Sequence, residues 1–107
     1  MDSKLAGAVS LCRKAGRLAA GGDAAQDAIY SGKAELVLLA KDLSERSARK
    51  LQKICGEKGI PCLCLAWAMA DLASYTGKEY GIFAVCDPGF AKMIGDAAAA
   101  AASLDIE

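Results

Sequence analysis

A Gly-Gly pair, Gly21 and Gly22, stands directly before a helical pattern that begins near Asp23. The first turn of a helix has free backbone N–H groups at the positive end of the helix dipole, so it can receive a phosphate. Glycine also allows the backbone of a ligand to come close. Three basic residues lie within 13–17, just before the pair. These features favour an anion or nucleic-acid surface, but an ordinary strand-to-helix turn with solvated charges has the same pattern.

Other residue types that carry chemistry are sparse. The chain has no histidine, which removes the commonest general base, and it shows neither a paired-carboxylate signature nor a phosphate-binding loop. We therefore expect no enzyme, no catalytic residue and no cofactor.

The cysteines do not form a metal-binding motif. There are five, an odd number, and none are spaced as Cys-x-x-Cys. Without histidine, a zinc site would need four thiolates from separate elements. Cys62 and Cys64 are two apart on a predicted strand and point the same way. We expect no metal site, and thiols that are mostly buried and not linked as disulfides.

Composition indicates one globular domain spanning residues 1–107, with 54% hydrophobic residues. No apolar run approaches the length of a membrane span and no signal peptide is evident, so we expect a cytoplasmic protein without a membrane partner. The net charge of zero argues against indiscriminate binding of nucleic acid. Residues 1–58 nevertheless hold 11 Lys/Arg and 7 Asp/Glu, whereas 59–107 hold 2 and 6, so a basic face remains possible.

Helical periodicity and short apolar runs alternate along the whole chain. The second and fourth runs are continuously apolar, which is typical of strands covered on both faces. This order predicts an α/β fold, a three-layer α/β/α sandwich around a short, mixed, four-stranded sheet. The predicted helices are 3–15, 23–31, 44–58, 66–75 and 88–104, and the predicted strands are 17–20, 35–40, 62–65 and 82–86.

Two helix starts are marked by residue type. Ser44 is a good N-cap, and Asp87 followed by Pro88 combines an N-cap with proline at the first helical position. In the last helix an apolar face is predicted from Phe90, Met93, Ile94 and Ala97. An alanine-rich extension of this helix is predicted from about residue 96.

Several local strings, taken in order, resemble one known family. They are Arg13–Leu18, Gly32–Asp42, Lys58–Pro61 and Thr76–Lys92. Together they resemble the kink-turn-binding ribosomal proteins, the superfamily of archaeal L-seven-Ae and eukaryotic L-thirty-e, and within it the small bacterial YlxQ-like branch. The resemblance covers about residues 1–95 and implies an α/β/α sandwich that binds RNA kink-turns.

The resemblance also implies where RNA would bind: the turn before the second helix, the first two turns of that helix, and the loop after the third strand. Gly21 matches the glycine of the family motif, and Asp23 matches the looser bacterial form of its third position. Ala24 stands where Glu or Gln is usual and has no side-chain hydrogen bond to offer a base. Asp27 stands where lysine is usual and repels phosphate.

The predicted RNA-binding set combines these positions with nearby cations. Lysines and an arginine would neutralise phosphates, and the loop after the third strand would cap the bulge. Trp67 could stack on an unpaired base or could simply cover the sheet edge, and the sequence leaves both open. The set is Arg17, Gly21, Gly22, Asp23, Asp27, Lys33, Lys41, Ala66 and Trp67.

Two functions therefore compete. The first is a ribosomal or ribosome-associated protein that recognises structured, kink-turn-like RNA by its shape. The second is a protein-interaction module that kept the fold and lost the RNA site, which Ala24, Asp27 and the zero net charge favour. A small enzyme is a third, less favoured alternative.

Overall fold

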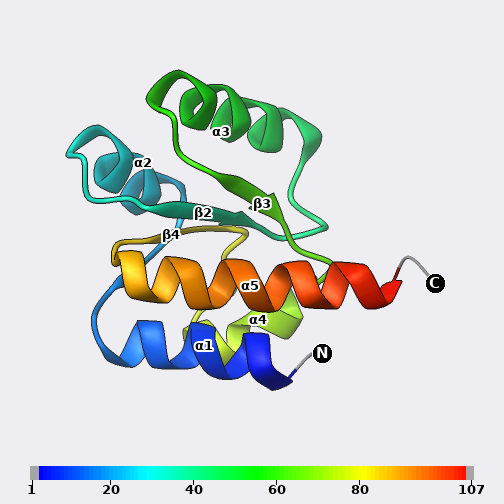
Figure 1. Cartoon of the computed structure of the whole chain (residues 1–107). Helices are drawn as coiled ribbons and strands as arrows, with labels where there is room; N and C mark the ends of the chain where they lie inside the picture. The colour runs from blue at the N-terminus through cyan, green and yellow to red at the C-terminus, as the bar shows by residue number, and fades with distance from the viewer. Residues whose placement is uncertain (1–2, 106–107) are drawn as a thin grey trace.

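The computed structural model describes residues 3–105, and it describes side chains for residues 4–99. A four-stranded sheet lies between two layers of helices, with α2 and α3 on one face and α1, α4 and α5 on the other (Figure 1). The predicted α/β/α sandwich is therefore confirmed. The helices are α1 (Ser3–Lys14), α2 (Gly22–Tyr30), α3 (Glu45–Lys58), α4 (Met69–Thr76) and α5 (Pro88–Asp105), and the strands are β1 (Leu18–Ala20), β2 (Leu36–Leu39), β3 (Cys62–Cys64) and β4 (Ile82–Val85).

The strands of the sheet follow the order β1-β4-β2-β3. β4 pairs antiparallel with both of its neighbours, whereas β2 and β3 are parallel, so the sheet is mixed as expected. Every residue of β2 and β4 is buried, which explains why both strands read as continuous apolar runs.

Each central strand supplies side chains to two separate cores. In β2, Leu36 and Leu38 belong to the cluster on the α1, α4 and α5 side. Val37 and Leu39 belong to the cluster under α2 and α3. Because side chains alternate along a strand, a register slip of one residue would exchange the two sets, so packing fixes the pairing of Leu38 with Phe83.

The marked helix starts are confirmed. The Ser44 side chain accepts a hydrogen bond from the Ser47 N–H at 3.2 Å. The Asp87 carboxylate accepts one from the Phe90 N–H at 2.9 Å. Each cap satisfies a donor that the helix itself cannot.

The predicted start of α4 at Ala66 is wrong, because the helix begins at Met69. Backbone contacts hold the preceding residues outside the helix: the Lys41 N–H donates to the Trp67 carbonyl at 2.9 Å. The Met69 N–H is itself capped by the carboxylate of Asp42, also at 2.9 Å. Alanine-rich local sequence favoured helix, and these tertiary hydrogen bonds overrode that preference.

The expected exposure of the thiols is only partly correct. All five cysteines are free; Cys12 and Cys55 are buried, Cys62 and Cys86 are half-buried, and Cys64 is exposed. Burial raises the pKa of Cys12 to about 11 and that of Cys62 to about 12. Cys64 departs from the expectation because β3 is an outer strand, paired only with β2.

The apolar face of α5 is narrower than predicted. Ile94 and Ala97 are buried and Phe90 is half-buried, but Met93 is 48% exposed. Ile94 and Ala97 follow Phe90 by four and seven positions, which is one helix face, and Met93 lies at the margin of that face. The helix itself continues through the alanine-rich segment to Asp105.

This difference along α5 predicts contrasting stability effects. Replacing Ile94, which is 0% exposed, with alanine leaves a cavity beside α1 and should lower the free energy of unfolding by about 2–5 kcal/mol. Met93→Ala is the matched control and should change it by less than about 1 kcal/mol. Urea denaturation measures both, and equal losses for the two variants would contradict this placement of α5.

Candidate functional site

One edge of the sheet gathers four segments that are far apart in the chain. Because only β4 runs antiparallel to its neighbours, its amino end meets the carboxyl ends of the other three strands at this edge. Ligands of open α/β sheets commonly bind where carboxyl ends of strands meet. We call this region the site edge, and it consists of Gly21–Asp23, Lys41–Asp42, Ala66–Ala68 and Tyr80–Gly81.

Backbone hydrogen bonds join the four segments. Together they hold each turn against its neighbour across the whole width of the sheet. The bonds run from the Gly21 N–H to the Ile82 carbonyl (2.8 Å), from the Ala40 N–H to the Gly81 carbonyl (2.9 Å), and from the Lys41 N–H to the Trp67 carbonyl (2.9 Å).

Gly21 forms the turn into α2 in a conformation that only glycine adopts readily. Its φ is 101° and its ψ 157°, and a Cβ at this position would lie 3.4 Å from Cε1 of the Tyr80 ring. Gly21 is consequently buried, while Asp23 and Ala24 behind it are exposed. The turn therefore fixes the direction in which the first turn of α2 faces solvent.

The first turn of α2 has unused hydrogen-bond donors. No side chain caps the helix, and its first backbone bond is from the Ala25 N–H to the Gly21 carbonyl. Among the described residues, no hydrogen bond reaches the N–H groups of Gly22, Asp23 and Ala24. These groups can donate to a phosphate or to an acceptor on a base.

The charges around these donors are mixed. Asp23 and Asp27 are both exposed and lie four residues apart, so they share one side of α2. The carboxylate of Asp23, in the first turn, lies near the positive end of the helix dipole and stabilises the helix, which is a structural role. Lys41 is exposed at the end of β2 and is the site-edge cation of the predicted set. A polyanion at this edge would meet both signs of charge.

Trp67 is half-buried and packs against the core on the α1, α4 and α5 side. With Tyr75 and residues of α4 it also lines a hollow of about 330 Å³. Ala66 beside it is exposed. Of the two interpretations left open for Trp67, covering the edge of the sheet agrees with this packing, and the part of the indole left exposed is what could meet a base.

Arg17 and Lys33 lie at the other ends of the strands, away from the site edge. The Arg17 carbonyl accepts a hydrogen bond from the Cys86 N–H at 2.8 Å, beyond the carboxyl end of β4. Strand β1 separates Arg17 from Gly21, a distance of about 13 Å at the usual rise per residue. Lys33 follows the carboxyl end of α2. The structure thus brings together Gly21, Gly22, Asp23, Lys41, Ala66 and Trp67, with Asp27 one helical turn further into α2.

Tyr80 and Gly81 belong to the site edge but were absent from the predicted set. Tyr80 is 37% exposed and its ring lies against Gly21. A Cβ on Gly81 would lie 2.9 Å from Cδ1 of Leu43, so the chain passes close to neighbouring side chains here. Only the strand order places this turn beside Gly21, and local sequence carries no signal of that order.

The described residues contain no cluster of three or more His, Cys, Asp or Glu side chains able to hold a metal ion. No helix among them is both long and apolar enough to cross a membrane.

The fold and this edge define a class of small three-layer domains in which a glycine turn opens a helix at the sheet edge. A family model described as the ribosomal protein L7Ae/L30e/S12e/Gadd45 family matches residues 3–94. The chain is also 31% identical, over 84 residues, to the RNA-binding protein YlxQ of Enterococcus faecium, covering 78% of this chain and 81% of that protein. The chain therefore belongs to the L7Ae/L30e/S12e/Gadd45 family, in its YlxQ-like branch.

Solved structures share the fold. A protein of unknown function from Bacillus halodurans C superimposes with a TM-score of 0.85 at 25% identity, covering 92% of this chain and 99% of that one. The 15.5kD RNA binding protein of Giardia lamblia gives a TM-score of 0.76 at 18% identity, covering 94% and 87%. The three-layer arrangement is thus common to proteins whose sequences have diverged widely.

The glycine turn predicts a contrast between adjacent residues. Gly21→Ala forces a side chain into a conformation adopted essentially by glycine alone, and should lower the free energy of unfolding by about 1–3 kcal/mol. Gly22→Ala is the control, because its Cβ would make only an ordinary 3.6 Å contact with Ile82. Urea denaturation measures both variants. A Gly22→Ala loss as large as that of Gly21→Ala would show that the turn does not depend on Gly21.

Proposed function

We propose that this protein binds structured RNA at the site edge, recognising a kink-turn-like stem by its shape as a ribosomal or ribosome-associated protein. The family to which the chain belongs contains ribosomal proteins by description, and its YlxQ relative is named as an RNA-binding protein. The site edge supplies the surface for such contacts.

The observation that carries the proposal is the glycine turn at Gly21 with the open donors behind it. The N–H groups of residues 22–24 point out of the first turn of α2 with no partner among the described residues. Lys41 and the loop at Ala66 and Trp67 lie along the same edge. A kinked stem would place a phosphate or a base edge at the donors and its unpaired bases near the loop.

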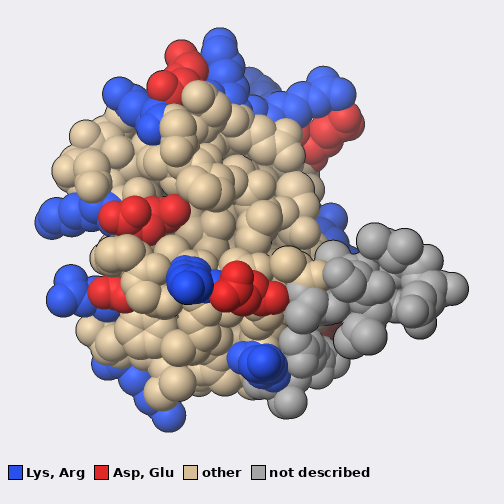
Figure 2. All heavy atoms as spheres, in the orientation of Figure 1, with Lys and Arg blue, Asp and Glu red and all other residues tan. Residues whose placement is uncertain are grey.

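The distribution of charge supports recognition by shape rather than by general attraction to phosphate. Basic side chains gather over α3 at the top of Figure 2, with acidic ones between them, and both signs occur lower on the same face. On α3, Arg49 pairs with Glu45. Because the net charge is zero and the signs are interspersed, general attraction to phosphate is weak, so RNA binding would have to rest on the shape of the kink.

A second candidate is a protein-interaction module of the same fold that has lost RNA binding. Ala24 and Asp27 are both exposed on α2, at positions where the family resemblance implies a polar side chain and a lysine. One removes a contact to a base and the other repels phosphate.

Substitutions on α2 separate the two candidates. Asp27→Lys replaces repulsion with attraction and should make the dependence of RNA affinity on salt steeper by about one unit of logarithmic slope. Adding Ala24→Glu should increase preference for a kink-turn RNA over a straight duplex. Asp96→Lys is the control, since Asp96 is also exposed but lies on α5, in the opposite helix layer. The measurement is affinity for both RNAs at several salt concentrations.

The two candidate functions predict different results. RNA binding in which Asp27→Lys steepens the salt dependence more than Asp96→Lys supports the site edge. If the folded double variant ignores kink-turn RNA altogether, this edge is no RNA surface and the protein-interaction module takes its place.

A further inference from the structure

Strand β1 has one edge that nothing in the described chain pairs with. It lies at the end of the sheet and is paired only with β4. In this antiparallel pair, the N–H of Gly21 and the carbonyl of Arg17 bond to β4, so alternation turns Leu18 and Ala20 the other way. Among the described residues, no hydrogen bond reaches the N–H and carbonyl groups of Leu18 and Ala20.

Apart from its shortness, this open edge lacks the usual devices that prevent pairing. The strand reads Leu-Ala-Ala, with no charged residue, proline or bulge within it. Its shortness limits an added strand to about four backbone hydrogen bonds, since two residues each offer a donor and an acceptor. A partner therefore needs side-chain contacts as well, and the surface beside β1 supplies them.

A hollow of about 340 Å³ lies beside the open edge. Leu18 and Ala20 form its apolar part, and the ring of Tyr80 also lines it. Arg13, from the last turn of α1, lines it too, and its guanidinium lies so close to Gly77 that a Cβ there would be 2.5 Å from Nη2. Because residue 77, at the end of α4, is a glycine, the arginine side chain has room to lie in this position.

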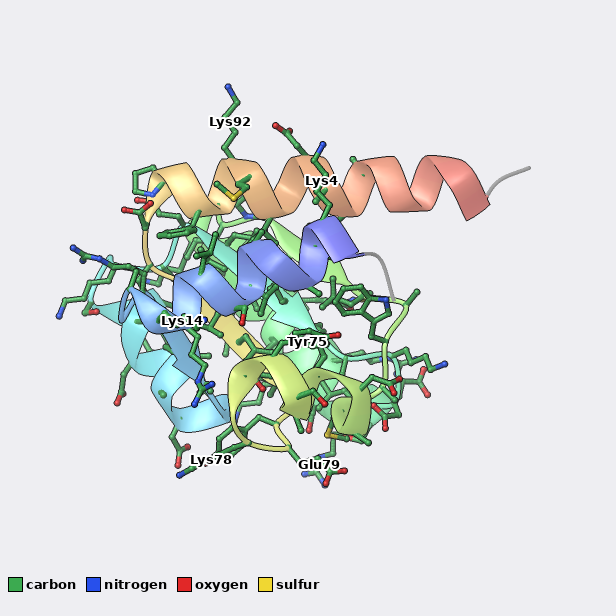
Figure 3. The ribbon with its side chains drawn as sticks, turned by 90° about the horizontal axis from the view of Figure 1, so that it is seen from below. Lys4, Lys14, Tyr75, Lys78, Glu79 and Lys92 are labelled. Atoms are coloured by element: carbon green, nitrogen blue, oxygen red, sulfur yellow. The ribbon has the colours of Figure 1, made fainter. Side chains whose placement is uncertain are left out.

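The charges around the hollow are predominantly positive. Arg13 and Lys78 line it, and Arg17 stands exposed at the amino end of β1. Viewed from below, Lys14 and Lys78 lie on the same side of the molecule, and the acidic Glu79 follows Lys78 at the same surface (Figure 3). A second copy of this chain, paired edge to edge, would bring the same cations together, so charge complementarity favours an acidic partner over a homodimer.

We propose that the open edge of β1 is a docking site for an extended, acidic peptide segment of a partner protein, which adds to the sheet as a fifth strand. Its backbone bonds to Leu18 and Ala20, an apolar side chain enters the hollow beside Tyr80, and its carboxylates face Arg13 and Lys78. This is recognition by strand addition, in which the backbone provides affinity and alternate side chains provide specificity. The proposal does not rest on RNA binding at the site edge, although Tyr80 belongs to both surfaces.

The direct test uses a capped seven-residue peptide, Thr-Glu-Thr-Val-Thr-Glu-Thr, titrated into ¹⁵N-labelled protein; its central valine and both glutamates lie on one face of the strand, as the single hollow requires. We expect saturable binding that protects the amides of Leu18 and Ala20 from hydrogen exchange. The same peptide with alternate amides N-methylated loses its donors to the strand and should bind at least tenfold more weakly. A peptide with lysine in place of glutamate should also lose at least tenfold.

Protein variants test the edge and the charge separately. Ala20→Pro removes an outward N–H without touching the bonds to β4, and proline is tolerated at such edge positions; it should weaken peptide binding at least tenfold. Lys78→Glu should do the same. Lys92→Glu is the charge control, since Lys92 projects from α5 away from Lys78 (Figure 3), and should leave affinity within twofold.

Other outcomes overturn the proposal. Equal binding of the N-methylated peptide, or protection that appears only at other strands, would show that β1 does not accept a strand. Concentration-dependent protection of Leu18 and Ala20 without peptide, together with a dimer in sedimentation, would make a second copy the occupant. Protection of the same amides by RNA alone would make the edge an extension of the RNA surface.

Discussion

The backbone pairing of β4 between β1 and β2 is the constraint on which the rest of the structure depends. β4 is the last strand in the chain but lies in the interior of the sheet, and its bonds to both neighbours use the whole of its length. The bond from the Gly21 N–H to the Ile82 carbonyl fixes the turn into α2. Without β4, the open donors of α2 and the loop after β3 would have no fixed relation.

The site edge, where the strand ends meet, differs in character from the open side of the outer strand β1. At the site edge, turns from all four strands meet, and the first turn of α2 offers donors beside charges of both signs. Along β1, the backbone itself is open and the surrounding charge is mostly positive. The proposed RNA surface and the proposed peptide surface therefore lie on one scaffold and share Tyr80, while the backbone groups that would bond to each partner differ.

Local patterns predicted the elements and their caps well, because Ser44, Asp87 and the continuous apolar runs each act through neighbouring residues. The turn at Gly21 was also foreseen. The strand order was not, and with it the closeness of Tyr80 to Gly21 and the separation of Arg17 and Lys33 from the site edge were missed. The predicted start of α4 was wrong for the same reason, since the Asp42 carboxylate that caps the helix comes from a distant segment.

Mapping of backbone amides tests the proposed binding of RNA at the site edge most directly. ¹⁵N-labelled protein is titrated with a kink-turn RNA and, in parallel, with a straight duplex of equal length. We expect the kink-turn alone to produce large, saturable shifts at residues 22–24, at Lys41 and at residues 66–68. Shifts confined to the basic side of α3, or to the region of Arg17 and Lys33 at the other ends of the strands, would contradict the proposal.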